Sequence, residues 1–385
     1  MLKNVATFNE FPVSSEKTID IGFDCDDVLF SCSDFAIEQV NKDYNLELET
    51  NKLKRWGYRY GDYKKMYQYF SDENFVRNQP VLDGAVQFMK KLNKVPNVRI
   101  YFVTAVPASM MSIRAESLKK NFPFIDEKNF ILTSSKNITK FDVFVDDNPM
   151  NIFSNKSEYR IVKRQKWNEF ITGILSFNTF EELWKIIETI LSKKGIHVKE
   201  DKISSKAMIT ALVGPSGGKK HEIVEFLKEA GMKKPTSYTT DSTSSENSHS
   251  IKIGEKKFDE MVEKEEIIFP TYYGNNKYGF KKEELEEMIQ NEEDIITLVD
   301  INSAYALKSK YPTRIIYREG EKEELITDIL NSNYSTQEAV NRIIALDNEK
   351  DNARLCDFII PSSDTARKAA QRIINLINEN TTIER

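Results

Sequence analysis

Cysteine and long apolar runs are scarce in this sequence of 385 residues. The three cysteines, Cys25, Cys32 and Cys356, are an odd number without metal-ligand spacing, which indicates reduced thiols in a cytoplasmic protein. The apolar runs are strand-length, as at 295–299, and fall short of the roughly 18–20 residues that a membrane span needs. Because residues 1–20 contain no apolar segment of the signal-peptide kind, we expect no secretory signal.

Charge of one sign is not in marked excess. Lys and Arg number 55 against 60 Asp and Glu, so the net charge is −5. No overall basic field attracts nucleic acid or an anionic membrane, and we expect neither as a partner, although a local groove could still bind one. With 40% hydrophobic and 30% charged residues, the composition is that of a globular protein, and the length predicts about two to three domains.

The first part of the chain predicts an α/β unit. Strand patterns at 19–23, 99–104 and 142–146 alternate with helical patterns, and each ends in polar residues. Alternating strands and helices favour a parallel sheet, whose ligand crevice lies at the carboxyl ends of its strands. The candidate site residues of this unit therefore lie at one edge of the sheet.

A second α/β pattern follows a polar, lysine-rich stretch. It opens with a strand at 207–213 that runs into a glycine-rich loop and then a helix. We therefore expect a first domain over 1–191, with a helical insert at about 31–79, a linker over 192–205 and a second domain over 206–385. The fold class is α/β in both domains.

Acidic residues follow two of the strands in the first unit: Asp24 and Asp26 after one, and Asp146 with Asp147 after another. Such carboxylates can converge on one ligand, where one attacks and another handles protons. Facing a phosphate they need positive charge, because like charges at about 4 Å repel by roughly 4 kcal/mol at an effective dielectric near 20. Lys136 is a candidate counter-charge, and ligands that are all oxygen favour Mg²⁺.

These residues resemble, in order, the four motifs of the haloacid dehalogenase superfamily of phosphotransferases. Asp24 and Asp26 match its DxD motif, Thr104 its Thr/Ser motif, Lys136 its Lys motif, and Asp146 with Asp147 its acidic motif. Within the superfamily the sequence is similar to the 5′(3′)-deoxyribonucleotidases over roughly 18–191. The segments that carry this likeness are FVRNQPVLDGA at 75–85, NKVPNV at 93–98, FVTAVP at 102–107 and LTSSK at 132–136.

The resemblance implies a Rossmann-like parallel sheet with a helical cap and a covalent mechanism. In it, Asp24 attacks phosphorus and forms an aspartyl-phosphate, while Asp26 protonates the leaving oxygen and later activates water. Mg²⁺ is then held by Asp24, the Asp26 carbonyl, and one or both of Asp146 and Asp147. No histidine lies in this unit, since the three are at 197, 221 and 249, which excludes a histidine-phosphatase mechanism there.

The same resemblance implies which residues hold the phosphoryl oxygens: Thr104, Ala105 and Lys136. Two positions depart from the family pattern. Ala105 stands where the nucleotidases often have Ser, and Asp27 stands where many members have Gly. Aromatic residues in the insert at 31–79 are expected to form its core or to stack on a nucleobase.

The second unit resembles the guanylate kinases. Its loop GPSGGKKH at 214–221 lies between a strand and a helix, as a phosphate-binding loop must. Further likeness lies in KPTSYTT at 234–240, YGNNKYG at 273–279, Asp300 after a strand, and NRI at 341–343. The candidate nucleotide-binding residues are Gly214, Ser216, Gly217 and Lys220.

This unit departs from the guanylate kinase pattern at positions that bind phosphate, Mg²⁺ or the base. Lys219 replaces a loop glycine, His221 replaces the Ser/Thr that would bind Mg²⁺, and Asp241 replaces a phosphate-gripping arginine. Ile268 or Phe269 takes the place of the glutamate that reads guanine, and 329–335 contains no arginine. An arginine in that lid contributes about 10³–10⁵ in rate. We therefore expect a degenerate, structural or regulatory module, with an active kinase of altered specificity as the other reading.

The sequence as a whole predicts a cytoplasmic, Mg²⁺-dependent 5′-nucleotidase that hydrolyses (deoxy)nucleoside monophosphates. Its second domain could bind another nucleotide or a protein partner, and a homodimer is left open. Three alternatives also stay open: a polynucleotide kinase/phosphatase that processes nucleic-acid ends, a bifunctional nucleotidase and nucleotide kinase, and a binding protein without catalysis.

Overall fold

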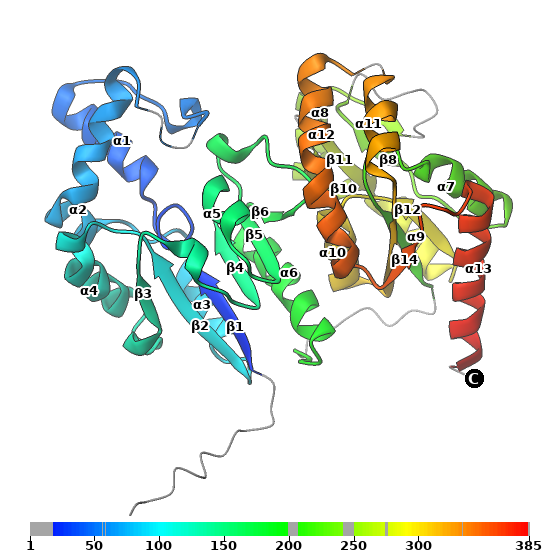
Figure 1. Cartoon of the computed structure of the whole chain (residues 1–385), viewed down its shortest axis with the longest axis horizontal. Helices are drawn as coiled ribbons and strands as arrows, with labels where there is room; N and C mark the ends of the chain where they lie inside the picture. The colour runs from blue at the N-terminus through cyan, green and yellow to red at the C-terminus, as the bar shows by residue number, and fades with distance from the viewer. Residues whose placement is uncertain are drawn as a thin grey trace, which may run out of the picture.

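The computed structural model describes residues 18–55, 57, 59–198, 207–241, 250–273, 276–332 and 334–383. It is an α/β protein, as predicted, with two halves side by side (Figure 1). The N-terminal half carries a six-stranded sheet, and the C-terminal half carries two four-stranded sheets. No helix in the described ranges is both long and apolar enough to cross a membrane.

The six-stranded sheet has the order β3-β2-β1-β4-β5-β6, and all its strands are parallel. Its central strand β1 is buried because helices cover both faces of the sheet. The strands are β1 (Ile19–Phe23), β2 (Val98–Thr104), β3 (Phe130–Leu132), β4 (Val143–Asp146), β5 (Tyr159–Lys163) and β6 (Leu175–Phe177). The three predicted strands are thus confirmed within a residue at each end.

The apolar faces of two helices cover one side of this sheet. In α3 (Ala85–Leu92) and α6 (Phe180–Lys193) the buried residues recur at helical spacing and pack with Ile21, Phe23 and Val145. On the other side of the sheet, Phe144 of β4 and Ile152 of α5 (Pro149–Ser154) belong to a second apolar cluster. The strand ends are therefore held between two packed layers.

The predicted helical insert follows β1. It contains α1 (Ser33–Tyr44), η1 (Thr50–Lys52), η2 (Gly61–Ser71) and α2 (Glu73–Asn78). Its side chains form an apolar cluster of their own, which includes Val40, Met66 and Phe75, and most of its described aromatic residues belong to that cluster. The aromatic residues Trp56 and Tyr58 lie outside the described residues.

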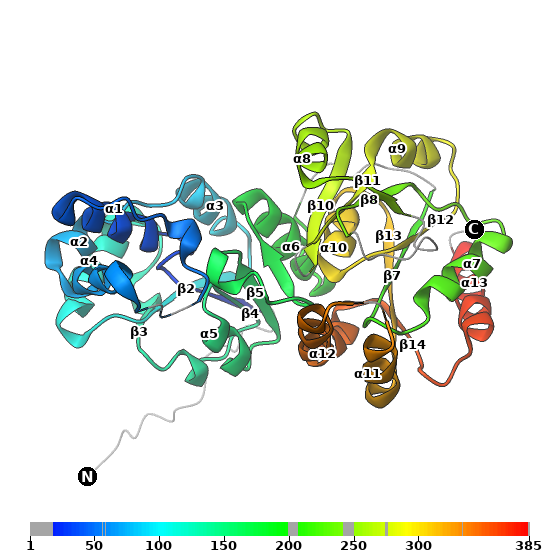
Figure 2. The ribbon, with the colours of Figure 1, turned by 90° about the horizontal axis from the view of Figure 1, so that it is seen from above.

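The C-terminal half has a parallel sheet of order β12-β7-β13-β14 and a mixed sheet of order β10-β11-β8-β9. The strands are β7 (Ile209–Val213), β8 (Ser237–Thr239), β9 (Ser250–Lys252), β10 (Ile267–Tyr273), β11 (Asn276–Lys281), β12 (Ile295–Leu298), β13 (Thr313–Arg318) and β14 (Phe358–Ile360). Figure 2 shows α11 and α12 on one side of these strands, and α8 and α9 on the other. The helices are α7 (Lys220–Glu229), α8 (Glu255–Glu263), α9 (Lys282–Gln290), α10 (Ile301–Lys310), α11 (Lys322–Leu330), α12 (Thr336–Asp351) and α13 (Ala366–Ile383).

The two halves share one apolar core. Helix α6 packs against α10, and Ile187 of the first half lies in the same cluster as Tyr305 of the second. The first two residues of the predicted linker continue α6, which ends at Lys193, and 199–206 lie outside the described residues. The halves therefore meet across a packed interface.

Candidate active site

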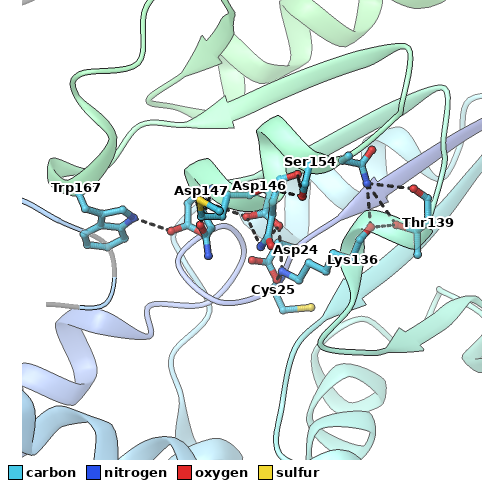
Figure 3. A network of polar contacts seen from close by, with 12 residues as sticks. Asp24, Cys25, Lys136, Thr139, Asp146, Asp147, Ser154 and Trp167 are labelled. Atoms are coloured by element: carbon cyan, nitrogen blue, oxygen red, sulfur yellow. Dashed lines mark hydrogen bonds and ion pairs between the residues drawn. The ribbon is translucent and has the colours of Figure 1, made fainter. Parts of the chain in front are cut away.

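The ends of β1 and β4 bring three carboxylates together. Asp24 directly follows β1, and its backbone N–H donates to the Val145 carbonyl at 2.8 Å, so pairing of the strands sets its position. Oxygens of Asp24, Asp146 and Asp147 lie within 4.8 Å of one another, and all three residues are buried (Figure 3). The predicted convergence of these acids at one edge of the sheet is what the structure has.

Lys136 supplies positive charge to this cluster. Its Nζ lies 2.6 Å from Asp24 Oδ1 and 3.0 Å from Asp146 Oδ2, and the side chain is buried (Figure 3). Burial alone would lower the pKa of Lys136, but the two carboxylates raise it above its usual value, so the amine stays charged. Burial raises the pKa of the Asp24 carboxyl to about 8, although Lys136 opposes that rise.

Two side chains from the segment after β5 fix Asp147. The indole Nε1 of Trp167 donates to Asp147 Oδ2 at 2.9 Å, and Asn168 Nδ2 donates to the Asp147 carbonyl at 2.8 Å. On the neighbouring acid, Asn151 Nδ2 donates to Asp146 Oδ2 at 3.0 Å. The acidic pair is thus oriented by a layer of donors that the sequence patterns did not reveal, because no spacing links Trp167 to Asp147.

The carboxylate cluster fits a divalent cation. Three carboxylates face one lysine, and burial also raises the pKa of Asp147 well above its usual value. Asp147 Oδ1 is buried and forms no hydrogen bond with a described group. A donor set made only of oxygens, with one oxygen left unpaired, suits Mg²⁺. The hydroxyl of Thr104, at the end of β2, is likewise buried and has no hydrogen-bond partner.

Asp26 is not one of the carboxylates in this cluster. Its Oδ1 accepts hydrogen bonds from Gln79 Nε2 at 2.8 Å and from Arg114 at 2.6 Å. Two donors from the insert and from α4 (Met111–Asn121) therefore hold the Asp26 side chain. Arg114 is among the largest fully buried side chains and lies over the Phe30 ring. Neither Gln79 nor Arg114 was anticipated from the sequence, since both come from elements distant from the DxD motif.

The departure at Asp27 has a structural explanation. Its φ of 56° is in the left-handed region that favours glycine. Its carboxylate accepts from the backbone N–H groups of Cys32 and Ser33 and from the Ser33 hydroxyl, which anchors the start of α1. Burial raises the pKa of Asp27 to about 7. The Asp27 carboxylate therefore holds the start of the insert in place and is not part of the buried acidic cluster.

A cavity of about 370 Å³ lies between the insert and the sheet. Asp26, Ala105 and Arg114 line it from the sheet side, and Ala105 is exposed there. Aromatic side chains line it as well: Tyr67, Phe70, Phe75 and Trp167. The cavity has space for an organic group next to the carboxylates.

A second cavity of about 810 Å³ contains the predicted nucleotide loop. Gly214, Ser216, Gly217 and Lys220 all line it. The ammonium group of Lys220 donates to the Pro215 carbonyl, and burial lowers the pKa of Lys220 to about 8. The loop therefore folds its own lysine inward.

Two residues of the second half that depart from the guanylate kinase pattern, Asp241 and Phe269, have different surroundings in the structure. Asp241 is buried and accepts a hydrogen bond from the Tyr278 hydroxyl at 3.2 Å, and its carboxylate lies 4.0 Å from the Arg342 guanidinium. A carboxylate thus lies where the guanylate kinase pattern has an arginine that grips phosphate. Phe269 does not line this cavity; it is 9% exposed and belongs to an apolar cluster.

Comparison with known proteins assigns the first half of the chain to a protein family. Residues 17–194 match the model of the family described as "5' nucleotidase, deoxy (Pyrimidine), cytosolic type C protein". A 5′(3′)-deoxyribonucleotidase from Clostridium acetobutylicum is 28% identical over 167 residues, 39% of this chain and 91% of its own. A protein from Staphylococcus epidermidis named "Putative 5'(3')-deoxyribonucleotidase" is 31% identical over 145 residues, 36% of this chain and 79% of its own.

Solved structures give weaker likenesses. A guanylate kinase from Anaplasma phagocytophilum has a TM-score of 0.37 at 19% identity, over 46% of this chain and 87% of its own. A haloacid dehalogenase-like hydrolase from Xanthomonas campestris has a TM-score of 0.32 at 12% identity, over 47% and 95%. At these TM-scores neither likeness carries an argument.

The parallel sheet and the acids at its edge, taken with the relatives, define a phosphatase of the haloacid dehalogenase type. Through its N-terminal half, the chain belongs to the 5′(3′)-deoxyribonucleotidase family.

Proposed function

We propose that the N-terminal half is a Mg²⁺-dependent nucleotidase that hydrolyses deoxynucleoside and nucleoside monophosphates. The observation that carries this proposal is the buried cluster of Asp24, Asp146 and Asp147 around Lys136, beside a cavity lined by aromatic side chains. The names of the relatives add the substrate class.

The reaction divides into two displacements on phosphorus. An oxygen of Asp24 forms a bond to phosphorus while the P–O5′ bond breaks, and Asp26 gives a proton to the leaving O5′. The oxygen of a water molecule then forms a bond to phosphorus while the bond from phosphorus to Asp24 breaks, Asp26 takes a proton from that water, and inorganic phosphate leaves. Thr104, the Ala105 backbone and Lys136 hold the phosphoryl oxygens. Asp24, Asp146, Asp147 and the Asp26 carbonyl would hold Mg²⁺, which neutralises charge on the phosphoryl group when bound.

The test measures phosphate release in the presence of Mg²⁺ from a panel of deoxy- and ribonucleoside 5′- and 3′-monophosphates, with a 3′-phosphorylated oligonucleotide beside them. We expect turnover of mononucleotides, and a loss of about 10⁴-fold or more in Asp24→Asn. Asp34→Asn is the control, because Asp34 is an exposed acid in the first turn of α1. Release from the oligonucleotide alone would contradict the proposal and favour end processing of nucleic acid.

For the C-terminal half, 206–385, we propose a guanylate kinase-like module without kinase activity that binds a phosphate-bearing ligand. The observation behind this is a conflict within its cavity: the loop lysine and glycines line it, but the carboxylate of Asp241 lines it as well, where a phosphate would need a cation.

The same Asp24→Asn protein tests this second proposal, because it leaves added GMP intact. Incubated with ATP, Mg²⁺ and GMP, it should form no GDP above the rate without enzyme. Formation of GDP that disappears in Lys220→Ala would show an active kinase instead.

A further inference from the structure

The cavity beneath the insert is lined by more arginines than acids. Three arginines line it, Arg55, Arg59 and Arg114, against the two acids Asp26 and Asp27. The reacting phosphate has its own cation in Lys136, which is bound to Asp24 and does not line this cavity. The arginines therefore need a different explanation.

Arg114 is already paired with Asp26, the proposed general acid and base. It is 2% exposed, and it donates to Asp26 at 2.6 Å. Its Nε and its second terminal nitrogen are buried without a hydrogen-bond partner. One ion pair thus compensates Asp26.

Arg55 and Arg59 lie on the insert side, between η1 and η2, and both side chains are exposed. No ion pair between described residues includes either of them, whereas Arg77, on α2, pairs with both Glu73 and Glu116. The guanidinium carbon of Arg59 lies 4.7 Å from the centre of the Tyr67 ring. The Arg59 guanidinium also forms a hydrogen bond with Tyr67, and its remaining N–H groups can donate to an anion.

We propose that this pair, Arg55 and Arg59, binds a second phosphate on the sugar, so that the preferred substrate class is the nucleoside 3′,5′-bisphosphates. This inference rests on the proposed nucleotidase function and extends it. One phosphate lies at Asp24 and is transferred: its ester P–O bond breaks, water supplies the oxygen, and inorganic phosphate leaves. The other phosphate stays on the sugar against the arginines, so the product is a nucleoside monophosphate.

The test compares kcat/KM for deoxythymidine 3′,5′-bisphosphate with that for deoxythymidine 5′-monophosphate at equal Mg²⁺. We expect the bisphosphate to be better by about tenfold or more, since hydrogen bonds to a charged group contribute about 1.5–3 kcal/mol. We also expect release from the bisphosphate in two phases: one equivalent of phosphate quickly, and the second at the slower rate of the monophosphate.

Variants separate this contact from a structural effect. In Arg55→Ala and Arg59→Ala the ratio of the two kcat/KM values should fall towards one, and Arg59→Lys should restore part of it. Lys54→Ala is the matched control, because Lys54 is an exposed cation in the same segment that does not line the cavity. Its ratio should equal that of the wild type.

Three outcomes overturn the inference. The first is monophosphate turnover with no preference for the bisphosphate. The second is a preference that survives in both arginine variants. The third is a 5′-phosphorylated dinucleotide that is hydrolysed as well as the bisphosphate, which would assign the arginines to a nucleic-acid backbone. By contrast, a wild-type protein that hydrolyses neither mononucleotide contradicts the proposed function itself.

Discussion

Single side chains outside the motifs set the geometry of the acidic cluster. Trp167 is 3% exposed, and its indole N–H donates to Asp147 Oδ2, leaving the other oxygen of that carboxylate without a partner. Donors behind a metal ligand orient it, and removing one typically reduces metal affinity by about 10–100-fold. The orientation of Asp147 therefore depends on a residue twenty positions away in the chain.

Trp167→Phe should weaken Mg²⁺ binding. The substitution keeps an aromatic ring in the site but removes the N–H, so Asp147 loses its orienting donor. We expect the Mg²⁺ concentration for half-maximal phosphate release to rise by about tenfold, with a smaller change in the rate at saturating Mg²⁺. A Mg²⁺ titration of activity measures both.

Trp184→Phe provides the comparison. Trp184 is a buried tryptophan on α6 that packs against Phe88 and Lys91. This variant should lose stability without a shift in Mg²⁺ dependence. Equal shifts in the two variants would mean that general loosening, and not the Asp147 contact, explains the effect.

At the scale of elements, the start of α7 is strained. Lys219 precedes the helix with φ 52° and ψ 24°, the left-handed conformation that costs a residue with a side chain about 1–2 kcal/mol. Gly214 and Gly217, with φ of 151° and 85°, adopt backbone conformations that glycine tolerates. The loop thus keeps the backbone path of a glycine-rich turn with a lysine at one of its left-handed positions.

Lys219→Gly should stabilise the protein. Relief of the left-handed strain exceeds the added freedom of glycine in the unfolded chain, which leaves a net gain of about 0.5–1 kcal/mol. Thermal unfolding should show a rise of roughly 2 °C in Tm. Lys228→Gly, inside the same helix, should lower Tm instead. A fall in both variants would contradict the strain at Lys219.

At the scale of the whole molecule, one segment of the first half packs against the second. Gly173, with φ 70°, lies against α12, where an added Cβ would come within 2.5 Å of Glu349 Cγ. Its carbonyl accepts from Asn352 Nδ2 at 3.0 Å. On a neighbouring strand, the backbone N–H of Ser176 donates to Asn302 Oδ1 at 2.8 Å. These contacts join the two halves around the shared apolar core.

Gly173→Ala should destabilise the contact between the halves. The substitution adds left-handed strain and a clash, and overpacking of this kind costs about 1–3 kcal/mol. Gly195→Ala has the same strain, with φ 84°, but meets no atom within 4 Å. Urea unfolding of both variants isolates the clash as the difference between them. Equal losses would show that the interface tolerates the added methyl group.

Much of the site was predictable because its chemistry is local. Asp24, Asp146 and Asp147 lie at or just after predicted strands, and parallel pairing brings strand ends to one edge whatever the intervening loops do. Three of the six strands of the first sheet were predicted, and two of these, β1 and β4, are short buried apolar runs. The sequence by itself therefore determined the α/β class and the identity of the acidic cluster.

The tertiary structure alone decided which distant side chains support that cluster. Trp167, Gln79 and Arg114 reach the acids from η6 (Lys166–Asn168), the insert and α4 (Met111–Asn121), and no periodicity encodes such contacts. It also decided that α6 and α10 share a core, where the sequence predicted only a linker between two domains. Packing depends on how whole surfaces fit, and that fit is a property of the folded elements together, not of any one segment.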